Sequence, residues 1–140
     1  EDKARGEELL LALAEDGDAD AMTALGIAYI RGFIEGGMKK GFEFIDRAAE
    51  AGVPEAMFQK GANLKPDASA NSDPEKALVW LKKAADAGHS GAMYAIGAMY
   101  WAGDGIPEDR EEGGKWYELS EEAEKLEKQS PRPFFEVLLD

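Results

Sequence analysis

The residues closest to a known catalytic motif lie in the stretch DAGHSGAMY, residues 86 to 94. The run Gly88-His89-Ser90-Gly91-Ala92 nearly matches the G-x-S-x-G nucleophile elbow of serine hydrolases and contains the single histidine of the chain. An elbow needs a strand before the serine and a separate histidine as its base, but His89 directly precedes Ser90 and no strand is predicted there. We therefore interpret the stretch as a turn between helices with His89 facing solvent, and we predict no catalytic residue.

The stretch DGDAD, residues 16 to 20, places three aspartates at alternate positions, as the first ligands of a calcium loop do. The rest of that pattern is absent, because Ala21 stands at the turn glycine and Ile27 at the final glutamate. An acidic turn that caps a helix is the better interpretation, and no metal site is predicted.

Glycines in GDGIPEDRE, residues 103 to 111, could suggest a phosphate-binding loop. The stretch has neither a preceding strand nor the lysine that meets phosphate, and its acidic neighbours would repel an anion. We expect a connection between two helices and predict no cofactor.

Residues 104 to 127 carry ten acidic side chains against three basic ones. Carboxylates that perform acid–base catalysis need a sheltered cleft, whereas a run of this kind is typical of a solvated helix face. A docking patch for a basic partner is the alternative. The whole chain has a net charge of −13, which argues against binding to nucleic acid or anionic membranes.

No apolar run approaches the roughly 20 residues of a membrane span, so we predict no membrane insertion. The chain has no cysteine, which leaves its compartment undetermined, and it begins at Glu1 rather than at methionine. We expect that it has been trimmed, and an exported or periplasmic location is favoured over the cytoplasm.

An internal repeat of 35 to 36 residues organises the chain. The segments AEDGDADAM (14–22), AEAGVPEAM (49–57) and ADAGHSGAM (85–93) align without gaps. Each repeat predicts two helices, because apolar residues recur at helical spacing and glycines stand where the helices should end. The predicted helices are 2–15, 20–31, 39–51, 55–65, 74–87, 91–102 and 109–128. This pattern predicts an all-α fold in which helix-turn-helix repeats stack into a right-handed α-α superhelix, or solenoid.

The third repeat carries Ala92, Ile96-Gly97 and Tyr100 in its first helix and Trp116-Tyr117 in its second. This pattern resembles the Sel-one-like repeat, a relative of the tetratricopeptide repeat. The resemblance covers about residues 4 to 125 and implies a non-catalytic protein-binding function and a bacterial source. The second repeat departs from the pattern at Lys60, where leucine is usual, and the third departs at Ser120-Glu121, where two alanines are usual.

We predict one repeat domain over residues 1–128, followed by a capping tail at 129–140. The domain would consist of a half unit at 1–17 and units at about 18–52, 53–88 and 89–125.

In related arrays, the positions between the framework residues of each first helix face the concave side and contact the ligand. The corresponding residues here are Thr23, Ile27, Ile30, Arg31, Phe58, Ala62, Lys65, Tyr94, Ala98 and Trp101. These predict a site for a peptide or protein with Phe58, Tyr94 and Trp101 as anchors, although packing between helices is an equal alternative for each residue.

The predicted function is that of a scaffold or adaptor for a protein or peptide partner. Because the surface of the chain is acidic, a basic partner is favoured. The main alternative is a dedicated inhibitor, such as an immunity-type protein that blocks a basic toxic enzyme.

Overall fold

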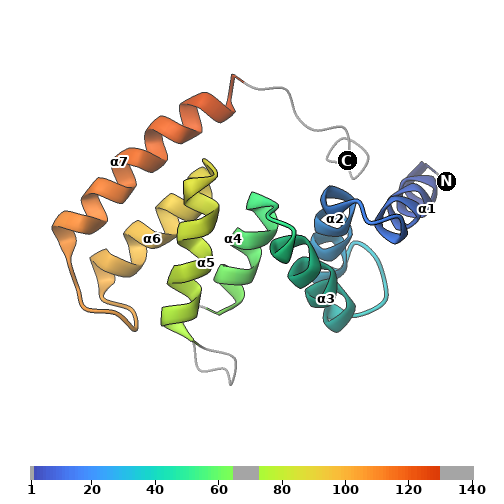
Figure 1. Cartoon of the computed structure of the whole chain (residues 1–140), viewed down its shortest axis with the longest axis horizontal. Helices are drawn as coiled ribbons and strands as arrows, with labels where there is room; N and C mark the ends of the chain where they lie inside the picture. Colours follow the sequence, from blue (N-terminus) through green and yellow to red (C-terminus); the bar gives the residue numbers. More distant parts are fainter. Residues whose placement is uncertain (1, 65–72, 130–140) are drawn as a thin grey trace. The chain divides into compact units, whose positions relative to one another are not determined.

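The computed structural model of the chain describes residues 2–64 and 73–129. The predicted capping tail (129–140) lies outside this range apart from its first residue. The described residues form seven α-helices and no strand: α1 (Asp2–Glu15), α2 (Ala19–Ile30), α3 (Met38–Glu50), α4 (Pro54–Asn63), α5 (Pro74–Asp86), α6 (Ser90–Ala102) and α7 (Arg110–Glu127) (Figure 1). The predicted helices are confirmed, with ends that differ by at most two residues.

Four helices begin at a side chain that accepts a hydrogen bond from the first turn. Asp18 accepts from the Ala21 amide at 2.9 Å, Asp73 from Lys76 at 3.1 Å and Asp109 from Glu112 at 3.0 Å. At the start of α6, His89 does the same, because its Nδ1 accepts from the Ala92 amide at 3.0 Å. Each bond satisfies a backbone donor that the helix itself leaves unpaired.

Three helices end at glycines that the repeat aligns, Gly17, Gly52 and Gly88, whose φ angles are 94°, 90° and 91°. These angles lie in the left-handed region, where a residue with a Cβ atom is strained. After α3, the Gly52 amide donates to the Ala49 carbonyl at 3.0 Å and the Val53 amide donates to Ala48 at 3.2 Å. The prediction that glycines stand where the helices end is thus confirmed at Gly52 and Gly88.

The described residues fall into two compact units, which divide after Ala56. In the first unit, α2 packs against α1 and α3. Leu25 and Ile45 are fully buried there, and a Cβ atom on Gly26 would lie 2.9 Å from the Gly41 carbonyl oxygen. Glycine therefore lets α2 and α3 pack backbone against backbone.

In the second unit, α6 packs against α5 and α7 around the fully buried Leu81 and Ile96. The close approach of α2 and α3 recurs here, because a Cβ atom on Gly97 would lie 3.0 Å from the Gly113 carbonyl oxygen. Lys60, the departure in the second repeat, places its ammonium 4.5 Å from the centre of the Trp80 ring. A cation–π contact thus stands at a framework position where leucine is usual.

Candidate protein-binding surface

Three of the predicted partner-binding residues share one face of α6. Tyr94, Ala98 and Trp101 follow each other at intervals of four and three residues, which is the spacing of one helical face. Tyr94 is 61% exposed and Trp101 is 43% exposed, while Ala98 is half-buried between them in sequence. Aromatic side chains with this exposure are only partly packed into the unit, so part of each ring faces solvent.

Tyr117 of α7 connects the two exposed rings. Its ring centre lies 5.1 Å from that of Tyr94 and 6.0 Å from that of Trp101, with the planes tilted by 46° and 50°. Burial raises the pKa of the Tyr117 phenol above its ordinary value, and the neighbouring Tyr94 adds to the rise. The raised pKa keeps the Tyr117 phenol neutral at physiological pH, so Tyr117 adds no charge beside the two exposed rings.

Sequence reasoning missed Tyr117 because it stands at a framework position of the second helix. A signal was available, since the other repeats carry Ile45 and Leu81 at this position and bury both completely. The aromatic residue at this position of the third repeat agrees with the family pattern, and it provides a ring where Ile45 and Leu81 provide buried aliphatic side chains.

Phe58 of α4 contacts the beginning of α6. Its ring stacks on His89, with ring centres 4.6 Å apart and planes inclined by 22°. Gly91 lies beneath both rings, since a Cβ atom there would approach His89 Cε1 to 2.9 Å and Phe58 Cζ to 3.7 Å. We call Phe58, Tyr94, Ala98, Trp101 and Tyr117 the aromatic surface.

The other predicted partner-binding residues have different surroundings. Thr23 is buried, and its hydroxyl donates to the Ala19 carbonyl of its own helix at 2.9 Å. Ile27, Ile30 and Ala62 are half-buried, and Arg31 is exposed at the C-terminal cap of α2. Lys65 lies outside the described residues. The structure thus brings together the predicted residues of α6, with Phe58 linked to them through His89 and Gly91.

Ser90 and His89 do not form a nucleophile and base. The Ser90 hydroxyl donates to Glu127 Oε2 at 2.7 Å, while His89 Nδ1 accepts the Ala92 amide as the helix cap. The predicted turn is confirmed, but the expected solvent-facing position of His89 is wrong. The imidazole is half-buried because it caps α6 and stacks on Phe58.

Ser90, Ser120 and Glu127 form a polar clasp that joins the beginning of α6 to the end of α7. Glu127 Oε1 accepts from the Ser90 amide at 3.0 Å, and the buried Ser120 hydroxyl donates to the Ser90 carbonyl at 3.0 Å. Ser120 therefore has a packing role at the position where alanine is usual. Glu127 places a carboxylate at the positive end of α6, which stabilises the helix.

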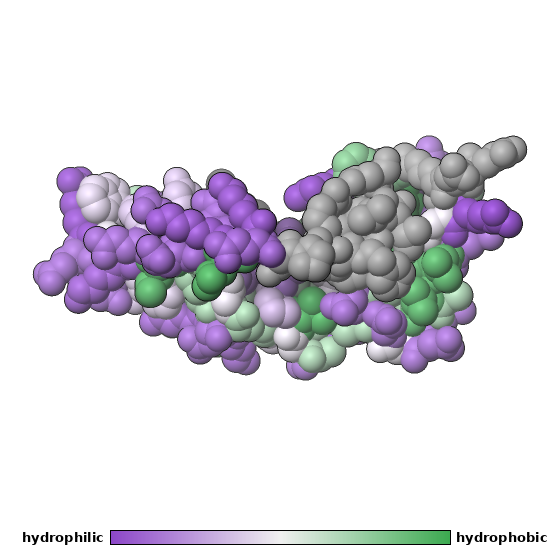
Figure 2. Space-filling view, turned by 90° about the horizontal axis from the view of Figure 1, so that it is seen from above, coloured by the Kyte–Doolittle hydropathy of each residue, from purple (hydrophilic) through white to green (hydrophobic). Residues whose placement is uncertain are grey.

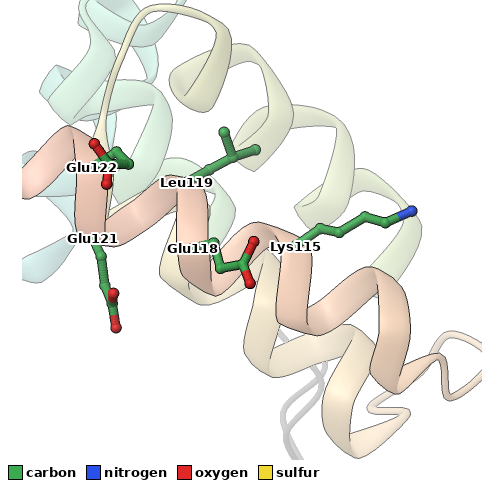
Figure 3. A pocket seen from close by; sticks show the side chains of 5 residues that line it. All are labelled: Lys115, Glu118, Leu119, Glu121 and Glu122. Atoms are coloured by element: carbon green, nitrogen blue, oxygen red, sulfur yellow. The ribbon is translucent and has the colours of Figure 1, made fainter.

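The acidic residues predicted to form a solvated face do so. Nine of the ten acidic residues between 104 and 127 are exposed, and Glu112 is half-buried. A shallow hollow on α7 is lined by Lys115, Glu118, Leu119, Glu121 and Glu122, whose side chains all project from the same helix (Figure 3). Hydrophilic side chains also cover much of the second unit in the view of Figure 2, interrupted by small hydrophobic patches.

The other motifs have structural roles. Asp18 of the DGDAD stretch caps α2, and Gly103 of the loop glycines ends α6 in the left-handed conformation. Among the residues that the structure describes, no helix has the length and apolar character to span a bilayer.

Comparison with known proteins establishes the family. A family model described as plant tetratricopeptide repeats matches residues 34–135. The crystal structure of a Sel1 repeat protein from Oxalobacter formigenes is similar, with a TM-score of 0.71 and 28% identity over 81% of this chain and 87% of that one. The chain is a Sel-one-like member of the tetratricopeptide repeat family.

A second solved Sel-one-like repeat structure is that of c5321, a protective antigen present in uropathogenic Escherichia coli strains. It matches with a TM-score of 0.74 and 33% identity, over 83% of this chain and 25% of that one. These neighbours confirm the predicted class of all-α solenoid repeats.

One curated relative is the exopolysaccharide production negative regulator of Rhizobium leguminosarum bv. viciae. It is 40% identical over 50 residues, which are 36% of this chain and 19% of the regulator. The match thus spans about a fifth of that protein. Sel-one-like and tetratricopeptide repeats are in general protein-interaction scaffolds without catalytic activity.

Proposed function

We propose that this Sel-one-like repeat chain is a non-catalytic adaptor that binds a peptide or protein segment on its aromatic surface. The observation that carries the proposal is the exposure of Tyr94 and Trp101, which Tyr117 joins into one cluster. Exposed aromatic side chains that cluster on a folded domain are typical of protein interfaces, where they supply much of the binding energy.

Small residues between the rings favour the same interpretation. Ala98 lies between Tyr94 and Trp101 on the same face of α6, so no long side chain stands between these two rings along that face, and Gly91 lies about one turn before Tyr94. A bound segment could therefore place its own side chains against the aromatic rings. The rings are also held by their neighbours, since Phe58 stacks on His89 and Tyr94 contacts Tyr117. Preordered rings lose little conformational entropy on binding.

The exopolysaccharide regulator supports a regulatory role for such binding. The name of that relative describes a negative regulator of exopolysaccharide production, and binding to another molecule is one way in which a repeat chain can regulate. We extend this to the present chain as part of the proposal, since the similarity covers 50 residues.

The charge of the chain favours a second candidate function. With a net charge of −13 and an exposed acidic face on the second unit, the chain could be a dedicated inhibitor of a basic enzyme. An adaptor should recover several partners with modest affinity. An inhibitor should recover one basic enzyme tightly and abolish its activity.

The test uses peptide segments selected from a displayed random library against the whole chain. We expect Trp101→Ala to weaken binding of the selected segments at least about tenfold, because an aromatic anchor contributes more than about 1.4 kcal/mol. Thermal unfolding should change less than it would for a fully buried residue, since Trp101 is 43% exposed.

Val79→Ala is the matched control. Val79 is 52% exposed and lies on α5, which contributes no residue to the aromatic surface, so this variant removes exposed apolar surface outside the proposed site. Its affinity for the segments should equal that of the wild type. Equal losses from both variants, or a large loss of stability in Trp101→Ala with unchanged affinity, would refute the proposed surface.

A further inference from the structure

We propose that the aromatic surface recognises an arginine side chain of the bound protein segment, which displaces Arg110 from the ring of Trp101. The inference rests on the proposed function and specifies the chemistry of its ligand. It starts from a cation that the chain already places on the surface.

Arg110 occupies the Trp101 ring in the free chain. The central carbon of its guanidinium lies 5.3 Å from the ring centre, within the range of a cation–π contact. Its Nε donates to Glu108 Oε1 at 2.9 Å, and both side chains are largely exposed. The chain thus contains a working example of an arginine bound between an indole ring and a carboxylate.

The position of Arg110 is unfavourable for its own helix. It is the first residue of α7, where the backbone dipole is positive, and the following residues Glu111 and Glu112 are of the sign that this end prefers. Helix stability therefore does not explain an arginine here. Its contacts with Trp101 and Glu108 are the interactions that it gains.

The contacts of Arg110 with Trp101 and Glu108 can be replaced by the same contacts from an arginine of the bound segment. An exposed ion pair such as Arg110–Glu108 contributes little, because water solvates both groups when they separate. An incoming guanidinium would find the indole ring and the Glu108 carboxylate already in place. Arg110 in turn would pass to solvent with its charge hydrated.

The charge around the surface selects a cation. Residues 104 to 127 hold ten acidic side chains and three basic ones, and Arg110 is one of these three. A basic segment is therefore attracted to α7, whereas an acidic one is repelled. Arginine is favoured over lysine because its planar guanidinium can stack on the ring and pair with the carboxylate together.

Displacement makes Arg110 an internal competitor. If an arginine of the bound segment must first displace Arg110, the observed affinity for the segment is lower than it would be with the Trp101 ring unoccupied. Substituting Arg110 should then strengthen binding of the segment. It does so although the substitution removes the contacts of Arg110 with Glu108 and Trp101 within the chain. A purely structural role for Arg110 predicts no such gain.

The experiment follows the indole N–H signals of the whole chain by ¹⁵N–¹H NMR. The chain has three tryptophans, Trp80, Trp101 and Trp116, so each spectrum contains two internal controls, and Trp101→Phe assigns the third signal. The probe is the blocked peptide Gly-Gly-Arg-Gly-Gly, and its control carries citrulline, a neutral group of similar shape.

We expect the Arg peptide to shift the Trp101 signal saturably while Trp80 and Trp116 stay in place. The citrulline peptide should leave all three unchanged. Arg110→Gln should bind the Arg peptide about 2- to 5-fold more tightly than the wild type, as expected when one exposed cation–π contact no longer competes. Lys115→Gln is the matched control, because it removes the same charge from α7 at a position where the lysine pairs with Glu111.

Equal shifts of all three signals, or equal shifts with citrulline, would overturn the inference, as would no shift at all. So would an affinity for Arg110→Gln that matches or falls below that of Lys115→Gln. The proposed function is tested separately. Library segments that depend on Trp101 but contain no arginine would leave the binding function intact and overturn only the arginine ligand.

Discussion

At the residue scale, two contacts of the His89 imidazole indicate its role. Nδ1 accepts the Ala92 amide, and the ring stacks on Phe58. Histidine is therefore an N-cap here, at the position where Asp18 caps the first repeat, and its ring also supports one edge of the aromatic surface. The sequence places a turn at this position, but the ring contact depends on Phe58, which is 31 residues distant.

His89→Ala should lower the free energy of unfolding by about 1–2 kcal/mol, because α6 loses its cap. His89→Asn should recover most of this loss, since the asparagine oxygen can accept the same amide, while neither variant keeps the stack on Phe58. Urea unfolding of the three proteins measures the difference. Equal stability of the alanine and asparagine variants would show that the hydrogen bond at 3.0 Å does not stabilise α6.

At the scale of elements, the distance between α6 and α7 depends on glycine. A Cβ atom on Gly113 would lie 2.9 Å from the Gly97 carbonyl oxygen and 3.1 Å from the Trp101 amide nitrogen. Both neighbours are backbone atoms, so the whole helix would have to move. The same arrangement joins Gly26 to Gly41 in the first unit, so both units contain a helix pair that packs backbone against backbone.

Gly113 and its neighbour Gly114 give opposite predictions for the same substitution. Gly113→Ala should destabilise the chain by about 1–3 kcal/mol, as overpacking does. Gly114→Ala should stabilise it by about 0.5–1 kcal/mol, because its Cβ atom meets no atom within 4 Å and alanine favours the helix.

Thermal or urea unfolding of both variants provides the measurement, and each variant is the control for the other. A stabilised Gly113→Ala would mean that the two helices are not held at the distance found here. The close approach of α6 and α7 would then not contribute to the stability of the chain.

Local patterns in the sequence predict the elements well and the site only in part. Helix ends follow from residues such as Asp73 and Gly88, whose effects act within one turn. The binding role proposed for Tyr94 and Trp101 can be predicted from the sequence, because both residues stand between framework residues. The roles of Tyr117 and Glu127 cannot be predicted in this way, because they arise only when α7 packs against α6. Thr23 shows the reverse, since a position between framework residues can be buried by its surroundings.

At the scale of the whole molecule, several exposed apolar side chains could take a partner. Among them are those of the aromatic surface and Leu119 and Leu126 of α7, which are 50% and 66% exposed. Leu119 stands among exposed glutamates and a lysine in the hollow of Figure 3. The aromatic surface has the larger side chains and ordered ring contacts, so the proposal assigns the binding function to it.

The most direct test is a map of chemical-shift changes across the ¹⁵N-labelled chain when a library-selected segment binds. The proposed function predicts that the largest changes fall on Tyr94, Ala98 and Trp101, with changes at Phe58 and Tyr117. Changes confined to α7 around Leu119 and Leu126 would contradict it, because the partner would then bind on a different face of the second unit.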